Sequence, residues 1–323
     1  MKILITGAAG FIGSNLAKKL LELNHEVTGI DNLSFGFMRN LEQIIKHPGF
    51  SFIEYDVRKR DSLHSIKADV LVHLASQKIP RYTNALATIT DNSAMLKNVV
   101  DKCVKDKIKI VYASTSDVYG KNPNIPYSEN SDLTLGKTTV KRWAYALSKI
   151  YGEQYIIAHA DEYGLEYTIT RFFGSYGPNQ NLTWWGGPQS VFIANALLKK
   201  PLEIHGDGLQ TRTFTFIEDT IDGLTKCIFD DNAKNDIFNI ANNPNEEITI
   251  LDLGKLIWKL INGDNSEAKI NLIPYESFGK YEDVRRRVPD ITKIKSLLNY
   301  SPKYSLKDGL KPTIEWQKKV TEQ

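Results

Sequence analysis

The hydrophobic and polar positions of the first 31 residues predict a strand, a turn, a helix and a second strand. Residues 2–6 form a short apolar run with β-branched side chains, which is typical of a buried strand. Residues 7–13 are rich in glycine and end that strand in a turn. Residues 25–30 return to a strand pattern, which ends at Asp31. Between the turn and this second strand, apolar residues recur at helical spacing, at Ile12, Leu16, Leu20 and Leu23.

The alternation of strand and helix patterns continues as far as residue 173. Helical spacing of apolar residues predicts helices over residues 41–48, around residues 95–103 and over residues 142–163. Strands that alternate with helices in this way predict an α/β fold with a doubly wound parallel sheet of the Rossmann type. The further predicted strands cover residues 50–55, 69–75, 109–113 and 167–173.

The character of the sequence changes at Gly174. Residues 175–189 are rich in turn residues and aromatics, which predicts the start of a smaller, substrate-binding part. Strand patterns at residues 213–216 and 237–240 are expected to return to the main sheet, and residues 251–261 are expected to form a helix. We therefore predict two interleaved domains. The dinucleotide-binding domain covers residues 1–174 and about 212–245, and the smaller domain covers residues 175–211 and 246–323.

The glycine turn carries the first chemical signal. Gly7 permits a tight turn, Gly10 lets the backbone approach a pyrophosphate, and Gly13 lets the helix pack closely on the strand. The free N–H groups at the start of the helix would then point at the phosphates. Asp31 is placed to accept a hydrogen bond from a ribose 2′-hydroxyl, which favours NAD over NADP. A plain βαβ turn without a ligand fits less well, because strand, helix and acid all stand at the expected spacing.

Further cofactor contacts are expected where the neighbouring strands end, because such sheets bind ligands at the carboxyl ends of their strands. Asp56 follows the strand over residues 50–55, where it would either meet the adenine or be a solvated loop acid. The other predicted contacts, besides the glycines and Asp31, are Phe11, Ile12, Asn32, Val57, Leu74, Ala75 and Asn92.

Composition and charge restrict the kind of partner. The 323 residues contain 41 basic and 38 acidic side chains, and no basic block stands out, so nucleic acid is not an expected partner. Cys103 and Cys227 are far apart in the sequence, which fits a reducing cytoplasm and no zinc site. The first strand begins at once and no apolar run reaches membrane length, so we expect no signal peptide, no membrane span and a cytoplasmic location.

Tyr145 and Lys149 lie one turn apart on one face of the helix predicted over residues 142–163. Tyrosine is a poor base at neutral pH, and a nearby ammonium group favours its ionised form. Tyr55 and Lys59 have the same spacing but no other chemical feature around them. Only the later pair follows a strand that ends in hydroxyl residues, among them Thr115, and we therefore assign the chemistry to it.

Several segments together resemble the extended short-chain dehydrogenase/reductase family, which includes nucleotide-sugar epimerases, dehydratases and decarboxylases. The resemblance covers nearly the whole chain and implies an NAD-dependent enzyme that acts on a UDP-sugar. It also implies a homodimer formed by the helices near residues 91–106 and 142–163. The matching segments are residues 6–13, 73–75, 115–119, 145–149, 171–178, 206–214 and 287–290.

The resemblance implies a role for each member of the catalytic group. Tyr145 would take the proton from the sugar 4-hydroxyl while C4 passes a hydride to NAD. Lys149 would hold the nicotinamide ribose and lower the tyrosine pKa, and Thr115 would hydrogen-bond the reacting oxygen. Lys78 stands where some epimerases place a cofactor-binding lysine.

The resemblance also implies contacts to the substrate. Arg212 and Arg287 match positions that bind the nucleotide diphosphate or the sugar, as paired guanidinium groups do well. Arg285 and Arg286, beside Arg287, are expected to be solvated. The implied substrate contacts are Lys78, Thr115, Ser116, Gly174, Gln189, Arg212 and Arg287.

Two positions depart from the family pattern. Gly174 stands where the family usually has asparagine, so a common contact to the substrate is missing or comes from elsewhere. Asp117 follows Thr115 and Ser116, whereas the dehydratases have Thr-Asp-Glu here and the decarboxylases Thr-Ser-Glu or Ser-Glu. Because aspartate is one methylene shorter than glutamate, we expect Asp117 to take part in catalysis as a binding group and not as a proton donor.

The first hypothesis is therefore an NAD-dependent epimerase that inverts C4 of a UDP-hexose or UDP-hexuronic acid through a transient 4-keto sugar. A UDP-glucuronate-type decarboxylase is the main alternative, followed by a nucleotide-sugar 4,6-dehydratase. A non-catalytic Rossmann protein that senses NAD is a further alternative, although Thr115, Tyr145 and Lys149 are all intact. Trp184 and Trp185 fit either core aromatics or residues that face the substrate.

Overall fold

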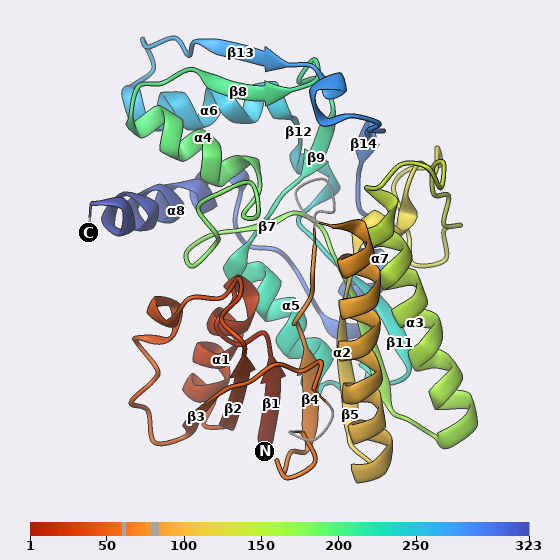
Figure 1. Cartoon of the computed structure of the whole chain (residues 1–323). Helices are drawn as coiled ribbons and strands as arrows, with labels where there is room; N and C mark the ends of the chain where they lie inside the picture. The colour runs from red at the N-terminus through yellow and green to blue at the C-terminus, as the bar shows by residue number, and fades with distance from the viewer. Residues whose placement is uncertain (60–62, 79–83, 323) are drawn as a thin grey trace.

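The computed structural model describes residues 1–59, 63–78 and 84–322. Its centre is a seven-stranded parallel sheet in the order β11-β6-β5-β4-β1-β2-β3 (Figure 1). The order reverses direction between β1 and β4, as expected for a doubly wound fold. The predicted fold class is therefore confirmed. The strands are β1 (Lys2–Thr6), β2 (Glu26–Asp31), β3 (Phe50–Glu54), β4 (Val70–His73), β5 (Lys109–Thr115), β6 (Tyr167–Phe172) and β11 (Asp236–Ile240).

Helices cover both faces of this sheet. Helices α1 (Phe11–Glu22) and α5 (Ile217–Phe229) pack against each other on one face. Helices α2 (Ala85–Asp106) and α3 (Trp143–Tyr163) lie side by side on the other face (Figure 1). Because β1 is buried on both faces, its residues are continuously apolar from Ile3 to Ile5.

The alternation of side chains along β1 divides the core into two layers. Ile3 and Ile5 belong to the apolar cluster that contains Leu16 of α1, whereas Leu4 belongs to the cluster that contains Leu96 of α2. The period of two in the strand and the helical spacing of the flanking segments therefore serve the same core. This agreement explains why the sequence pattern alone identifies the fold.

The second part of the chain forms small sheets and helices above the carboxyl ends of the main strands (Figure 1). The small sheets pair β8 (Leu202–His205) with β13 (Ile270–Ile273), and β9 (Thr211–Thr213) with β12 (Glu247–Thr249) and β14 (Arg286–Arg287). The helices of this part are α4 (Pro188–Leu197), α6 (Ile250–Asn262) and α8 (Leu306–Thr321). Helix α7 (Thr292–Leu298) instead packs against β11 of the main sheet.

Two local expectations are wrong. Residues 213–216 do not join the main sheet, because Thr213 ends β9 and Thr215 begins β10 (Thr215–Phe216), which pairs with β7 (Ser175–Tyr176). Residues 41–48 form turns after a single 3₁₀ turn, η1 (Met38–Leu41), because too few residues separate it from Pro48 for a stable helix. Strand β11 does return to the main sheet beside β6, as predicted. The domain boundaries stay a prediction.

Candidate active site

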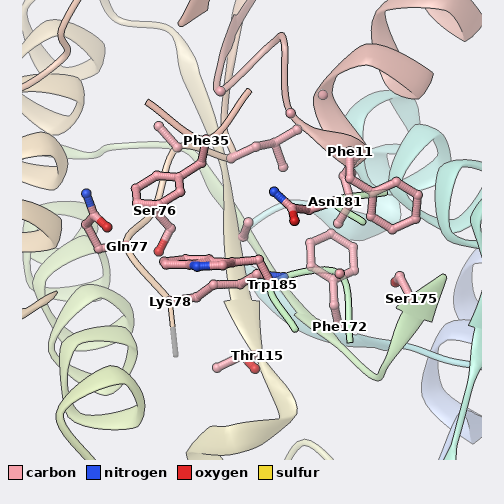
Figure 2. Close-up of a pocket in the computed structure, with 18 of the residues that line it drawn as sticks. Phe11, Phe35, Ser76, Gln77, Lys78, Thr115, Phe172, Ser175, Asn181 and Trp185 are labelled. Carbon is pink, nitrogen blue, oxygen red and sulfur yellow. The ribbon is translucent and has the colours of Figure 1, made fainter. Parts of the chain in front are cut away.

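A cavity of about 540 Å³ opens at the carboxyl ends of the main strands, between them and the smaller part (Figure 2). The structure brings the predicted site residues together around it, with the exception of Asn92. The predicted residues that line the cavity are Gly7, Gly10, Phe11, Ile12, Gly13, Asp31, Asn32, Asp56, Val57, Leu74, Ala75, Lys78, Thr115, Ser116, Asp117, Tyr145, Lys149, Gly174, Gln189, Arg212 and Arg287.

The glycine turn has the geometry that a pyrophosphate requires. Gly7 has a φ of +76°, and a Cβ on Gly13 would lie 2.1 Å from the carbonyl oxygen of Gly7. Only glycine therefore allows α1 to start this close to β1. Gly10 precedes α1 without any side-chain cap, so the free N–H groups at the start of the helix are left for a ligand in the cavity.

Asp31 lies at the end of β2 with its carboxylate held by two backbone groups. It accepts hydrogen bonds from the N–H groups of Ala9 at 3.0 Å and Leu33 at 2.8 Å. Burial raises the pKa of Asp31, and these bonds oppose the rise. The carboxylate is therefore fixed at the cavity wall, where it is suited to accept from a ribose hydroxyl.

Replacing Asp31 with alanine is expected to weaken NAD binding and to reduce the preference for NAD over NADP. A hydrogen bond to a charged group contributes about 1.5–3 kcal/mol, which corresponds to roughly tenfold to a hundredfold in affinity. Calorimetric titration of both cofactors into the wild-type and Asp31→Ala proteins would measure this. Equal affinity of the wild-type protein for the two cofactors would contradict the role of Asp31.

Asp56 is neither free nor merely solvated. Arg58 donates to its carboxylate from Nε at 3.0 Å and also bonds Asp91 at 3.0 Å. The hydrogen bond from Arg58 lowers the pKa of Asp56 to about 2, although burial opposes this.

Asn92 lies behind the cavity wall, where it accepts from the N–H of Gln77 at 2.7 Å. Asn92 therefore bonds a residue of the cavity wall and does not itself line the cavity, and its contact with the cofactor stays a prediction.

The predicted catalytic residues meet where β5 ends beside α3. Tyr145 hydrogen-bonds Thr115, and Lys149 donates to the carbonyl oxygen of Ala113 at 2.7 Å. Burial lowers the pKa of Lys149 to about 7, with Glu153 opposing the shift. Burial, together with the charge of Asp117, raises the pKa of Tyr145. The hydrogen bond to Thr115 opposes this rise, and the lowering of the tyrosine pKa by Lys149 stays a prediction.

Three arginines surround Asp117 in the same cavity. Its carboxylate accepts from Arg287 at 2.6 Å and from Arg142 at 3.1 Å, and the charge of Arg212 acts on it as well. Burial alone would raise the pKa of Asp117, but the arginines outweigh it and bring the pKa to about 2. Lys78 is exposed to the cavity, whose walls shield it from bulk water and lower its pKa to about 8, with Asp117 opposing.

Arg142 is the main functional residue that the sequence analysis missed. It stands at the N-terminus of α3, three positions before Tyr145, and its spacing would have placed it on the same helix face. Its guanidinium also donates to the carbonyl oxygen of Glu282 at 2.8 Å and packs over the ring of Tyr281. The lining residues Phe35 and Ser76 were likewise not predicted, because they come from loops without a chemical motif.

Gln189, Arg287 and Gly174 add a buried amide, a guanidinium group and a glycine to the cavity lining. Among the described residues, the Nε2 group of buried Gln189 and the Nε of Arg287 have no hydrogen-bond partner, which suits them to a ligand. Gly174 has a φ of +49°, and its Cβ would lie 3.0 Å from the ring of Phe214. Any side chain at Gly174 would therefore press on this ring, and what replaces the family's usual contact stays open.

The two tryptophans have different surroundings. Trp185 projects into the cavity and packs against Phe35, with ring centroids 4.2 Å apart and the rings tilted by 31° (Figure 2). Trp184 lies at the cavity edge but packs on His205 at 4.1 Å and against Phe192 of the core. The sequence left two alternatives open for these tryptophans, a side chain that faces the substrate or one in the core. Trp185 faces the cavity, and Trp184 packs with the core.

The described residues contain no group of three or more His, Cys, Asp or Glu side chains that could hold a metal ion. Within the described ranges, no helix combines the length and the apolar character that a membrane crossing requires. Cys103 and Cys227 are both buried as free thiols.

The fold and this site define a class of Rossmann enzymes that bind NAD. Residues 3–241 match the NAD-dependent epimerase/dehydratase family, and the chain belongs to this family, within the extended short-chain dehydrogenase/reductase group. The chain is 34% identical to a UDP-N-acetyl-alpha-D-glucosaminuronate decarboxylase of Bacillus cytotoxicus, over 99% of this chain and 98% of the relative. It is also 34% identical to UDP-glucuronic acid decarboxylase 1 of Danio rerio, over 98% of this chain and 72% of the relative.

A solved structure resembles the whole chain. The UDP-glucuronic acid 4-epimerase of Bacillus cereus, in complex with UDP-glucuronic acid and NAD, superposes with a TM-score of 0.88. The two sequences are 29% identical, and the match covers 99% of this chain and 100% of that chain. The cofactor of this family is NAD, which the glycine turn and Asp31 fit.

Proposed function

We propose that this protein oxidises C4 of a UDP-hexuronic acid and then releases its C6 carboxylate as carbon dioxide. The observation that carries the proposal is the group formed by Asp117, Arg142 and Arg287 beside Tyr145. Arg287 keeps one N–H without a partner among the described residues, so a sugar carboxylate would find a guanidinium donor. The decarboxylases among the relatives support the same reaction.

The residues at the end of β5 and on α3 perform the first step. Tyr145 takes the proton of the 4-hydroxyl, and Thr115 hydrogen-bonds the same oxygen and orients it. Lys149 supplies positive charge near the phenolate, because its ammonium nitrogen lies 5.8 Å from the centre of the Tyr145 ring. When bound, NAD supplies the hydride acceptor for this oxidation and the hydride donor for its reversal.

The 4-keto acid explains the loss of carbon dioxide. Oxidation at C4 makes the C6 carboxylate β to a ketone, so the electron pair of the C5–C6 bond can pass into the carbonyl as carbon dioxide leaves. A proton is then added to C5, and return of the hydride to C4 with protonation of the 4-oxygen completes a UDP-pentose, so the whole reaction takes up one proton from solvent. Asp117 has a pKa of about 2 and is therefore a poor donor of the C5 proton. Tyr145 is left as the acid, and it regains a proton from solvent before it protonates the 4-oxygen.

C4 epimerisation is the second candidate, and the state of Asp117 favours it. The carboxylate is one methylene shorter than the glutamate of the decarboxylases and is already bound by two arginines. An epimerase needs only Tyr145, Thr115 and NAD, together with room for the keto sugar to turn over. The resemblance to the Bacillus cereus epimerase supports this alternative.

Incubation of the purified protein with UDP-glucuronic acid and UDP-N-acetylglucosaminuronic acid in D₂O separates the candidates. Decarboxylation gives a UDP-pentose with one deuterium at C5 and an equal amount of carbon dioxide. Epimerisation gives a C4 epimer that keeps its carboxylate and carries no deuterium. NMR and mass spectrometry of the products would identify either result, and turnover of a neutral UDP-hexose alone would contradict the choice of a uronic acid.

The packing of Trp185 against Phe35 is expected to slow the release of NAD. An aromatic pair contributes about 0.5–1.5 kcal/mol, so Trp185→Ala should release the cofactor roughly twofold to tenfold faster. Trp185→Phe keeps an aromatic ring on Phe35 and is the matched control. Stopped-flow displacement of bound NAD by an analogue would measure the rates. Unchanged release in Trp185→Ala would contradict a retaining role.

We infer that two copies of the chain associate through α2 and α3 into a four-helix interface. These helices lie side by side and expose Leu86, Leu147, Tyr151 and Tyr163, which suits contact with a second copy. Tyr151→Glu should therefore dissociate the dimer, whereas Leu198→Glu, on an exposed residue of the smaller part, should not. Sedimentation equilibrium would show this, and a wild-type monomer at micromolar concentration would rule the dimer out.

A cytoplasmic location of the protein stays a prediction.

A further inference from the structure

A series of buried polar side chains, linked by hydrogen bonds, lies next to the cavity but does not line it. It begins at Glu153, two turns after Tyr145 on α3. The carboxylate of Glu153 accepts from the hydroxyl of Ser114 at 2.5 Å and from Arg171 at 3.0 Å through Nε and 2.6 Å through Nη2. Both side chains of the Glu153–Arg171 ion pair are only 4% exposed. Glu153 therefore joins α3 to the ends of both β5 and β6.

The series of hydrogen bonds continues from Arg171 toward the smaller part. Arg171 donates from Nη1 to the hydroxyl oxygen of Tyr119 at 3.0 Å, and Tyr119 donates to Oδ1 of Asn239 at 2.7 Å. The amide group of Asn239 then donates to the carbonyl oxygens of Tyr127 at 2.9 Å and Asp290 at 3.0 Å. We call these four side chains, of Glu153, Arg171, Tyr119 and Asn239, the buried polar network.

Each end of the network adjoins a group of the site. At the first end, Ser114 lies between Ala113, whose carbonyl oxygen binds Lys149, and Thr115, which binds Tyr145. At the other end, Asp290 lies three residues after Arg287. The backbone between them is held by bonds from the N–H of Tyr127 to the carbonyl oxygen of Val288 and from the N–H of Asp290 to the carbonyl oxygen of Tyr127.

The energetics of this network argue against a purely stabilising role. Burying an ion pair costs several kcal/mol of desolvation per ion, and apolar residues of similar volume often serve stability equally well. Hydrogen bonds with fixed directions instead hold their partners in one arrangement when every member is satisfied. This network joins β5 and α3, which carry Thr115, Tyr145 and Lys149, through β6 and β11 to the segment that directly follows Arg287 of β14.

We propose that the buried polar network positions Arg287 relative to Tyr145 and Lys149, so that the two sides of the cavity engage one sugar at the same time. Its four members are positioning residues, since none of them lines the cavity. The proposal rests on the proposed function only in taking Tyr145 as the base and Arg287 as a substrate ligand.

Tyr119→Phe is the mildest test, because it keeps the ring and removes only the hydroxyl that joins Arg171 to Asn239. We expect kcat to fall by about tenfold to a hundredfold, because even a small misplacement of the reacting groups can slow the reaction by this much. NAD occupancy is expected to stay the same, because the glycine turn and Asp31 lie outside the network. The amides of residues 286–290 should exchange hydrogen faster than in the wild-type protein.

Tyr300→Phe is the matched control. Its hydroxyl is also buried and donates to one partner, the carbonyl oxygen of Ala241 at 2.8 Å, but the network does not include it. Its kcat and its exchange over residues 286–290 should match those of the wild-type protein. A second pair of variants tests the other end of the network, where Glu153→Asp should recover part of the kcat that Glu153→Gln loses.

An unchanged kcat in Tyr119→Phe, or an equal loss of kcat in Tyr300→Phe, would overturn the proposal. Unchanged exchange at residues 286–290 in Tyr119→Phe would overturn it independently of any substrate. If the wild-type protein turns over no UDP-uronic acid, the proposed function fails, while hydrogen exchange still decides on the network.

Discussion

Replacing Tyr145 with phenylalanine is expected to lower kcat by about two to four powers of ten, which is what general acid–base catalysis typically contributes. The variant should keep its fold, because the hydroxyl contributes a hydrogen bond to Thr115 while the ring supplies the packing. It should also keep bound NAD, since the glycine turn and Asp31 are unchanged. Product formation from a UDP-uronic acid, together with the absorbance of the retained cofactor, would measure both effects.

Tyr155→Phe is the matched control for this variant. Tyr155 lies on the same helix, is half-buried and does not line the cavity. Loss of its hydroxyl should leave kcat unchanged. Wild-type rates in Tyr145→Phe would remove the tyrosine from the mechanism, and an equal loss in both variants would indicate a general effect on α3.

Arg287→Met is expected to lower kcat by about a hundredfold to a thousandfold, the usual cost of removing one charged donor from a site that excludes water. The same change removes the nearest partner of Asp117, whose pKa should then rise from about 2 because burial favours the neutral acid. The KM for the UDP-uronic acid should rise as well. Steady-state kinetics with a UDP-uronic acid would separate the two parameters.

Arg286→Met is the control that the sequence offers directly beside it. Arg286 is 55% exposed and pairs with Glu247 at the surface, and surface pairs of this kind contribute about 1 kcal/mol or less. Its kinetics should match the wild-type protein. If Arg287→Met turns over a UDP-uronic acid at the same rate as Arg286→Met, the guanidinium of Arg287 takes no part in recognising the substrate.

The main sheet was predictable because two independent patterns agree along it. Buried parallel strands give continuous apolar runs, and the helices between them give a spacing that matches one face. The strands over residues 213–216 were misplaced because β9 and β10 are only two or three residues long. Their partners, β12, β14 and β7, come from distant parts of the chain, and local pattern carries no information about which partner a short strand takes.

The site was predictable where a motif has its own chemistry, as in the glycine turn and the pair of Tyr145 and Lys149. Arg142 was missed because arginine at a helix terminus is usually solvated, and only the tertiary structure brings it to Asp117. The pKa of Tyr145 could not be inferred from the sequence either. It depends on how much desolvation the surrounding walls impose, and burial is the largest cause of its rise.

The position of α7 has a consequence for the order in which the chain acquires its structure during synthesis. Strand β11, the edge strand beside β6, is covered by α7, and its Asn239 bonds the backbone of Asp290. The last strand of the main sheet is therefore made some fifty residues before the segment that covers it, as Figure 1 shows by its colours. Synthesis must therefore pass α7 before this cover can form. Glu129, which is made earlier, accepts from the N–H of Asn239, but until α7 is made the rest of β11 is an open strand edge, where nascent chains are most exposed to mispairing with one another.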